Sequence, residues 1–171
     1  TVFMTASQPQ PDDSQCEGTF LEWGGSADGW FSFTADVNAV HHFTTCDAGS
    51  YDTSIVLYED SCDNQVTCNG DGDSDTGCQI YYSAFDYDCT AGTTYYIRIG
   101  GWQGETGTGT LNIHIVPPPP SGACCFPNQF CLDGITAPLC DAYDGFFAGD
   151  GTVCENNDPC DFDNPFQHRL F

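Results

Sequence analysis

Positive charge is almost missing from this sequence. The 171 residues include no lysine and only two arginines, Arg98 and Arg169, against 25 acidic residues, so the formal net charge is −23. A chain this acidic repels the phosphates of nucleic acids and the anionic surface of a membrane. The composition therefore argues against binding either of them, and it favours cations as ligands or simply a highly soluble surface.

Long apolar segments and targeting signals are missing as well. No apolar run is long enough to insert into and span a bilayer, and no Asn-x-Ser/Thr sequon occurs. The sequence opens at Thr1 without a basic-then-apolar leader, so we expect that any signal peptide has been removed. Twelve cysteines imply an oxidising compartment. We therefore expect an extracellular or cell-surface protein.

Recognisable catalytic motifs are also missing. The sequence contains no Gly-x-Ser-x-Gly, no His-Glu-x-x-His and no P-loop. Asp75-Thr76-Gly77 has the three letters of an aspartic protease motif, but Asp73-Ser74 and Cys78 flank it instead of an apolar strand. His41 and His42 are neighbours in a predicted strand, so they should point to opposite faces and cannot share a metal, while His114 and His168 are isolated. We expect no enzyme activity.

What the sequence does contain is a series of short segments with period two. In Thr93–Ile99, for example, Tyr95, Ile97 and Ile99 share one face, and Arg98 lies on the other, where we expect it to pair with an aspartate. The same pattern predicts strands at Gly18–Trp23, Trp30–Ala35, Val40–Cys46, Thr53–Tyr58, Gln79–Ala84, Thr93–Ile99 and Thr110–Val116. Such strands without a convincing helix predict an all-β, antiparallel, jelly-roll-like β-sandwich.

Several of these segments together resemble a known family. Their order along the chain is Trp30–Ala35, Phe43–Cys46, Tyr51–Tyr58, Cys68-Asn69 and Ala91–Trp102. This series resembles the bacterial pre-peptidase C-terminal domain, a small β-sandwich appended to secreted proteins. The resemblance covers roughly residues 12–116 and implies the fold, but its motifs belong to strands and turns and say little about chemistry.

Prolines mark the expected domain boundaries. Pro9 and Pro11 separate an N-terminal extended strand and spacer, residues 1–11, from the sandwich, residues 12–116. A polyproline linker at 117–121 precedes a disulfide-rich module at 122–160 and a C-terminal tail at 161–171. The module, with Gly122-Ala-Cys-Cys-Phe-Pro near its start, resembles a cysteine-rich module of secreted planctomycete-type proteins.

The linker divides the cysteines six and six, and we expect all of them to be oxidised with no bridge across it. The local spacing and the family resemblance suggest the pairs Cys16–Cys46, Cys62–Cys68 and Cys78–Cys89. In the module the fifteen possible pairings stay open, except that Cys124 and Cys125 should not pair with each other, because a ring between neighbours is strained. The module's cysteines are Cys124, Cys125, Cys131, Cys140, Cys154 and Cys160.

One acidic stretch has the pattern of a metal-binding loop. Asn69, Asp71, Asp73 and Asp75 occupy alternate positions, and hard oxygen ligands at such positions suit Ca²⁺. The stretch is not an EF-hand, because no glutamate closes it and no helices flank it. Some pre-peptidase-like domains carry Ca²⁺ in acidic loops, so the resemblance also implies calcium as a possible cofactor. The alternative is a solvated acidic loop.

The N-terminal segment suggests self-assembly. Val2, Met4 and Ala6 alternate with Phe3 and Thr5, a pattern that an exposed tail would not need. A strand outside the sandwich can complete the sheet of a neighbouring copy, and such a head-to-tail contact propagates into a filament. We therefore expect a non-catalytic structural protein that forms a homopolymer by strand donation. The alternative for this segment is pairing within its own sandwich.

A second function is compatible with the same sequence. The chain could be a carbohydrate- or protein-binding accessory module of a larger secreted enzyme or surface protein. Trp23, Trp30 and Trp102, with the many tyrosines, could form a platform on which sugars stack. The bland alternative is that Trp30 belongs to the core and that Trp102 packs on a loop.

Overall fold

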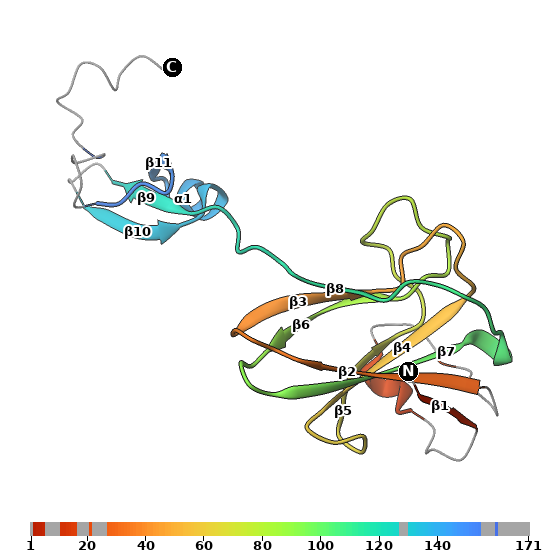
Figure 1. The fold of residues 1–171 in the computed structure, drawn as a ribbon. Coiled ribbons are helices and arrows are strands. Elements are labelled where there is room, and N and C mark those ends of the chain that lie inside the picture. Colours follow the sequence, from red (N-terminus) through yellow and green to blue (C-terminus); the bar gives the residue numbers. More distant parts are fainter. Residues whose placement is uncertain are drawn as a thin grey trace. The chain divides into compact units, whose positions relative to one another are not determined.

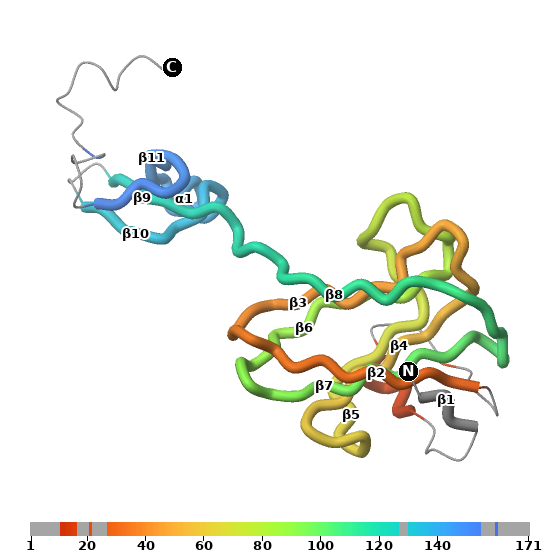
Figure 2. Tube along the Cα trace, viewed as in Figure 1, coloured from red at the N-terminus to blue at the C-terminus, as the bar shows by residue number. Residues whose placement is uncertain are grey.

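The chain divides into two compact units, Thr1–Val116 and Pro117–Phe171, and the break falls at the start of the polyproline segment. The computed structural model describes residues 11–16, 21, 27–126, 130–154 and 160, together with the backbone of residues 2–5. Figures 1 and 2 show the two units, which are described separately below.

The first unit is an antiparallel β-sandwich. One sheet has five strands in the order β1-β2-β7-β4-β5, and the other has three strands in the order β6-β3-β8. The five-stranded sheet contains β1 (Val2–Thr5), β2 (Ala27–Thr34), β7 (Thr94–Gly101), β4 (Thr53–Glu59) and β5 (Gln65–Asn69). The three-stranded sheet contains β6 (Ala84–Cys89), β3 (Ala39–Thr44) and β8 (Asn112–Ile115). Every strand pair is antiparallel, so the predicted all-β fold class is confirmed.

The core lies between the two sheets, as the period-two pattern predicts. Tyr95 and Ile97 of β7 are fully buried and pack with Leu57 of β4 against Phe43 and Phe85 of the opposite sheet. The Phe43 and Phe85 rings stack with centroids 5.3 Å apart. Aromatic and β-branched side chains on one face of each sheet thus remove a continuous apolar surface from water.

The five-stranded sheet is also covered on its outer face. Val56, Tyr58 and Cys68 on that face form a second buried cluster with Cys16 and Leu21. The covering segment includes the short 3₁₀ helix η1 (Asp13–Gln15) and is tied to the sheet by the Cys16–Cys68 disulfide. Strand β4 is therefore buried on both faces, which explains why it carries a continuous apolar run instead of an alternating one.

Two strand predictions fail in instructive ways. The predicted strand Gln79–Ala84 is wrong, because only Ala84 belongs to a strand and Ile80 and Tyr81 are exposed on the loop before β6. Strand β5 escaped prediction because Gln65–Asn69 has few β-branched residues and gains its place by pairing with β4. Of the predicted strand Gly18–Trp23, only Leu21 lies within the described residues, and it is not in a strand.

The second unit is a small three-stranded sheet in the order β10-β9-β11. Its strands are β9 (Gly122–Cys125), β10 (Cys131–Ile135) and β11 (Phe146–Asp150). A six-residue helix, α1 (Ala137–Ala142), lies between β10 and β11. Pro138 stands in the first turn of α1, where a missing N–H costs no hydrogen bond.

Five disulfides are present, and the pairs suggested for the sandwich are wrong. The structure joins Cys16 to Cys68 and Cys46 to Cys78. It leaves Cys62 exposed and Cys89 buried as free thiols, so the expectation that all twelve cysteines are oxidised is wrong. In the second unit, Cys124 and Cys125 bond to different partners, as expected, and no bridge crosses the linker. The three bonds there are Cys124–Cys140, Cys125–Cys160 and Cys131–Cys154. The disulfides indicate an oxidising environment.

No helix in the described residues is long and apolar enough to cross a membrane.

Candidate functional site

The predicted assembly strand occupies an edge of the five-stranded sheet. Residues Val2–Thr5 form β1 and pair with β2, from Val2 opposite Trp30 to Thr5 opposite Ala27. Ala6 lies outside the described residues. In the single chain the strand therefore pairs within its own sandwich, which is the alternative that the sequence left open for this segment.

The predicted calcium ligands are divided between separate contacts. Asn69 accepts a hydrogen bond from the backbone N–H of Ala84 at 3.0 Å, and Asp75 accepts one from the Thr44 hydroxyl at 2.6 Å. Asp71 and Asp73 are exposed. Among the described residues, the carboxylates of the three aspartates do not gather within 4.8 Å of one another. Calcium binding by this stretch stays a prediction.

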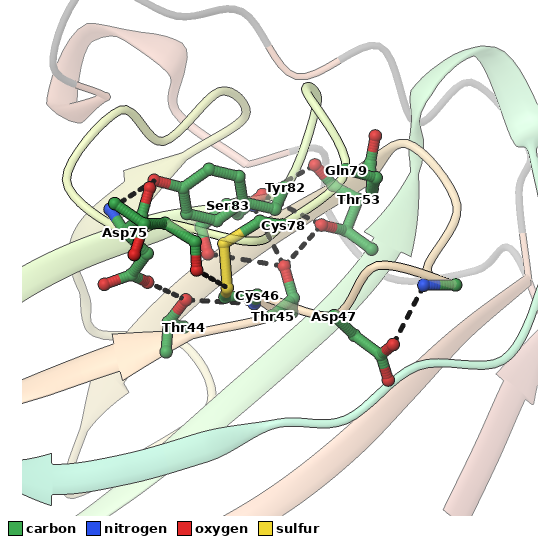
Figure 3. Close-up of a disulfide and its surroundings, with 12 residues drawn as sticks. Thr44, Thr45, Cys46, Asp47, Thr53, Asp75, Cys78, Gln79, Tyr82 and Ser83 are labelled. Atoms are coloured by element: carbon green, nitrogen blue, oxygen red, sulfur yellow. Dashed lines mark hydrogen bonds between the residues drawn. A yellow bond between two sulfur atoms is a disulfide. The ribbon is translucent and has the colours of Figure 1, made fainter.

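The acidic loop, residues 70–83 between β5 and β6, is nevertheless firmly anchored. Figure 3 shows its centre, where the Cys46–Cys78 disulfide ties the loop to the end of β3. The N–H of Asp75 donates to the Tyr82 hydroxyl at 2.6 Å, and Gly72 packs so closely that an added Cβ would lie 2.8 Å from the Tyr82 ring. The loop is thus held by covalent, hydrogen-bonded and steric contacts.

A histidine between two aspartates lies under this loop. His42 is 7% exposed, its Nδ1 is 2.6 Å from Oδ1 of Asp86, and its Nε2 is 3.2 Å from Oδ2 of Asp75. The His114 ring lies beside it, with the two ring centroids 5.1 Å apart. His41 instead packs against Phe33 on the core side, so the predicted opposite orientation of the adjacent histidines is confirmed.

The two aspartates determine the electrostatics of this cluster. Burial disfavours the charged form of His42, but hydrogen bonds to Asp86 and Asp75, with their negative charges, outweigh burial and raise its pKa. Burial likewise acts to raise the pKa of Asp75, but hydrogen bonds from Thr44 and His42 and the charges of His42 and His114 lower it. The arrangement therefore favours a protonated His42 bridging two carboxylates.

Sequence reasoning missed this cluster because it treated His114 as isolated. In the three-stranded sheet, His42 pairs directly with Asp86 of β6 and with His114 of β8. The register between strands that are distant in the sequence brings these side chains together, and that register cannot be predicted from a local motif. The only available signal was that His42 and His114 both fall on polar faces of predicted strands.

A cavity of about 550 Å³ opens in the sandwich unit. Its lining includes none of the histidines and aspartates of the cluster around His42. Phe31, Ile99 and Leu111 supply apolar lining, while Tyr51 and Thr108 are among the hydroxyl-bearing residues around it. The 105–110 loop is closely packed here, since an added Cβ on Gly107 would lie 2.6 Å from the Tyr51 ring. Apolar lining with hydroxyl groups is a common composition for small-molecule sites.

Of the tryptophans suggested for a sugar platform, Trp30 is partly buried against the second cluster, and Trp102 begins the 3₁₀ helix η2 (Trp102–Gly104). Trp30 packs against Tyr58 with ring centroids 5.2 Å apart, and the Arg98 guanidinium lies 5.6 Å from its ring centroid. Arg98 also donates to Asp28, and both side chains are nearly fully buried, so the expected pairing of Arg98 with an aspartate is confirmed. Trp23 lies outside the described residues.

The two free cysteines differ in accessibility and neither is strongly activated. Burial raises the pKa of Cys89 to about 11, beyond what a hydrogen bond from Tyr95 offsets. Burial and the charge of Asp63 also raise the pKa of the exposed Cys62. Because the thiolate is the reactive form, both thiols should react slowly at neutral pH.

Comparisons with known proteins give no identification, because no family model, curated protein or solved structure matches the chain. The resemblance to the pre-peptidase C-terminal domain therefore rests on the sequence motifs alone.

Proposed function

We propose that the protein is a non-catalytic structural subunit that acts outside the cell and assembles through its N-terminal strand. The observation that carries this proposal is the pairing of β1 with β2 at the edge of the five-stranded sheet. An edge strand can be exchanged between copies without creating a new kind of contact, because the same main-chain hydrogen bonds form in either case.

The edge of β2 can accept such a strand. Strand β2 has eight residues, and β1 pairs only with Ala27–Trp30. The segment after β1 contains Pro9 and Pro11, which cannot donate to a sheet and which stiffen the chain. The net charge of −23 opposes association, so main-chain bonds and apolar burial must exceed the repulsion.

The test compares the full chain with a chain lacking residues 1–8. Strand donation predicts large particles for the full chain by sedimentation and negative-stain microscopy, and monomers for the truncated one. Adding a peptide of residues 1–8 to the truncated chain should place a strand on the free edge of β2 and raise the melting temperature of the chain. Polymers from the truncated chain, or a full chain that stays monomeric at all concentrations, would contradict the proposal.

A finer version of the test uses proline at adjacent positions of β1. In an antiparallel ladder, neighbouring residues alternate between pointing their N–H at the partner strand and pointing it away. Phe3→Pro and Met4→Pro should therefore differ, because only one of them removes a ladder hydrogen bond. Equal polymerisation of both variants and of the unchanged chain would exclude β1 as the assembly element.

A carbohydrate-binding module is the second candidate, and the cavity lined by Phe31, Tyr51, Ile99, Thr108 and Leu111 is the observation in its favour. Apolar lining could stack on a sugar ring while the hydroxyl groups bond to its substituents. The acidic chain would select neutral or cationic sugars. Titration of neutral oligosaccharides should then shift the NMR signals of Thr108 and Leu111 while leaving those of Thr34, on β2, unchanged. A titration without shifts around the cavity would remove this candidate.

A further inference from the structure

The polar side chains on the outer face of the three-stranded sheet form one row. Asp86, His42 and His114 are direct cross-strand partners on β6, β3 and β8. Direct partners project from the same face of a sheet. This face is the outer one, because the next residue, Phe43, is in the core. Asp75 reaches the same row from the acidic loop.

His42 has the surroundings of a metal-binding histidine. Its contact with Asp86 at 2.6 Å occupies Nδ1 and leaves Nε2 facing Asp75. Histidines that ligate a metal commonly donate their other ring N–H to a carboxylate, which fixes the ring and raises its basicity. Since His42 is only 7% exposed, packing also restricts its rotation.

The spacing of two ligand atoms already suits an ion. Zinc binds histidine nitrogen at about 2.0–2.1 Å and carboxylate oxygen at about 2.0–2.2 Å, so two such ligands on a tetrahedral ion lie roughly 3.3 Å apart. The observed separation of His42 Nε2 and Asp75 Oδ2 is 3.2 Å. Asp75 is itself held by the Thr44 hydroxyl and, through its N–H, by Tyr82. An ion between these two atoms would take the place of the shared proton.

His114 is the third ligand that the sheet provides. Its ring centroid lies 5.1 Å from that of His42, close to the roughly 5 Å expected for two imidazoles on one tetrahedral ion. In the described conformation the ligand atoms of His42, Asp75 and His114 do not all lie within 4.8 Å of one another. Because His114 is exposed, a rotation of its side chain can bring a ring nitrogen inward without moving the backbone.

We propose that His42, Asp75 and His114 bind one divalent first-row transition-metal ion, with Zn²⁺ as the reference ion and Asp86 supporting His42. Two imidazoles and one carboxylate suit Zn²⁺, Cu²⁺ or Ni²⁺, whereas Ca²⁺ prefers a set of oxygen ligands. The charge of the chain attracts cations to its surface. The ion would fasten the acidic loop to the sheet and is independent of strand donation.

The experiment is a calorimetric titration of Zn²⁺ into chelator-treated full-length protein. All samples carry Cys62→Ser, which removes the exposed thiol as a competing ligand. The proposal predicts one ion per chain. His114→Ala should weaken binding by about tenfold or more, and Asp86→Asn by about 10–100-fold. The matched controls are Asn112→Ala on β8 and Asp88→Asn on β6, which should leave the affinity unchanged.

A spectroscopic measurement guards against variants that fold poorly. Co²⁺ bound in a tetrahedral site absorbs strongly in the visible range, so the protein should develop these bands with one equivalent of Co²⁺ and His114→Ala should lose them. His114 is exposed, so this variant should keep its fold, which circular dichroism checks. Absence of stoichiometric Zn²⁺ binding, or equal affinity in the His114→Ala variant, would overturn the proposal.

Discussion

The sandwich and the C-terminal unit are stabilised in different ways, the first by an apolar core and the second by disulfide bonds. In the sandwich the fully buried side chains are mostly aromatic and aliphatic, among them Phe43, Leu57 and Tyr95. In the C-terminal unit the buried apolar residues that the structure describes are Ala123 and four cysteines, while Tyr143 is 64% exposed. A unit this small cannot bury enough apolar surface, so cross-links that restrict its unfolded chain take over the role of a core.

Chemical reduction should break this comparison most severely. The three disulfides of the C-terminal unit span 16, 35 and 23 residues, and each contributes about 3 kcal/mol by restricting the unfolded chain. We expect reduction to unfold this unit completely, while the sandwich survives the loss of its two disulfides because its apolar core remains. Hydrogen exchange by mass spectrometry, with and without reductant, measures both units in one sample. Persistent amide protection in β9–β11 after reduction would contradict the contrast.

The same aliphatic truncation in each unit gives the next largest effect. Leu57→Ala, at a fully buried position of the sandwich, should lower the free energy of unfolding by about 3 kcal/mol because it leaves a cavity. Leu132→Ala, at a 38% exposed position of β10, should cost about 0.5 kcal/mol or less. Urea unfolding curves followed separately for the two units provide the values. Similar losses from the two substitutions would mean that the C-terminal unit has an apolar core after all.

A glycine beside two sulfur atoms tests how tightly the disulfides of the C-terminal unit are packed. A Cβ on Gly145 would lie 2.4 Å from Sγ of Cys124 and 2.9 Å from Sγ of Cys140. Gly145→Ala should therefore destabilise the C-terminal unit by about 2 kcal/mol, as overpacking does in an apolar core. Gly49→Ala is the control in the sandwich, because its added Cβ would come no closer than 3.6 Å to Asp47. Equal melting temperatures for the two variants would show that the sulfur atoms are not tightly packed.

The smallest effect depends on pH and concerns the sandwich alone. Burial and the charges of Asp71 and Glu105 raise the pKa of Asp52 from 3.8 to about 6. Between these values the folded chain keeps a proton that the unfolded chain has lost, so stability falls as pH rises through this window. Asp52→Asn should stabilise the sandwich by about 1 kcal/mol at pH 7, after allowance for solvent screening, and should have no effect at pH 3.

An aspartate with the opposite shift provides the control for that experiment. Hydrogen bonds from the Gly49 N–H and the Thr110 hydroxyl lower the pKa of Asp47, so its charged form favours the folded state. Asp47→Asn should therefore reduce stability at pH 7 and not at pH values below its pKa. Thermal melts at the two pH values test both signs. A change of the same sign in both variants would show that net charge, and not these local contacts, controls the pH dependence.

The sequence predicts those parts of the fold whose cause is local. Strand β7 is recognisable because Tyr95 and Ile97 face the core between the sheets, while Tyr96 between them lies on the opposite face. The proline-rich segment after Val116 likewise marks the boundary between the units by its own stiffness. Strand β5 and the loop before β6 could not be assigned in this way, because their conformation depends on pairing and packing with distant residues.

The candidate sites show the same limit more sharply. The alternating acidic residues suggested that Asp71, Asp73 and Asp75 act together, but Asp75 instead contacts His42 and Thr44 of β3. The pair His42 and His114 meets only through the register of β3 with β8. Disulfide pairing likewise depends on the tertiary structure. Cys16 bonds to Cys68 because the segment that contains Cys16 packs on the outer face of the five-stranded sheet.

The buried Arg98 has a practical consequence for resistance to proteolysis. Trypsin-type proteases cut after lysine and arginine, and this sequence offers them only Arg98 and Arg169. Arg98 is 3% exposed in β7, between β2 and β4, so its peptide bond cannot enter a protease cleft until the sheet opens. The folded sandwich should therefore resist cleavage by such enzymes. Because cleavage at Arg98 requires the sheet to open, the rate of cleavage by trypsin measures the opening of this unit.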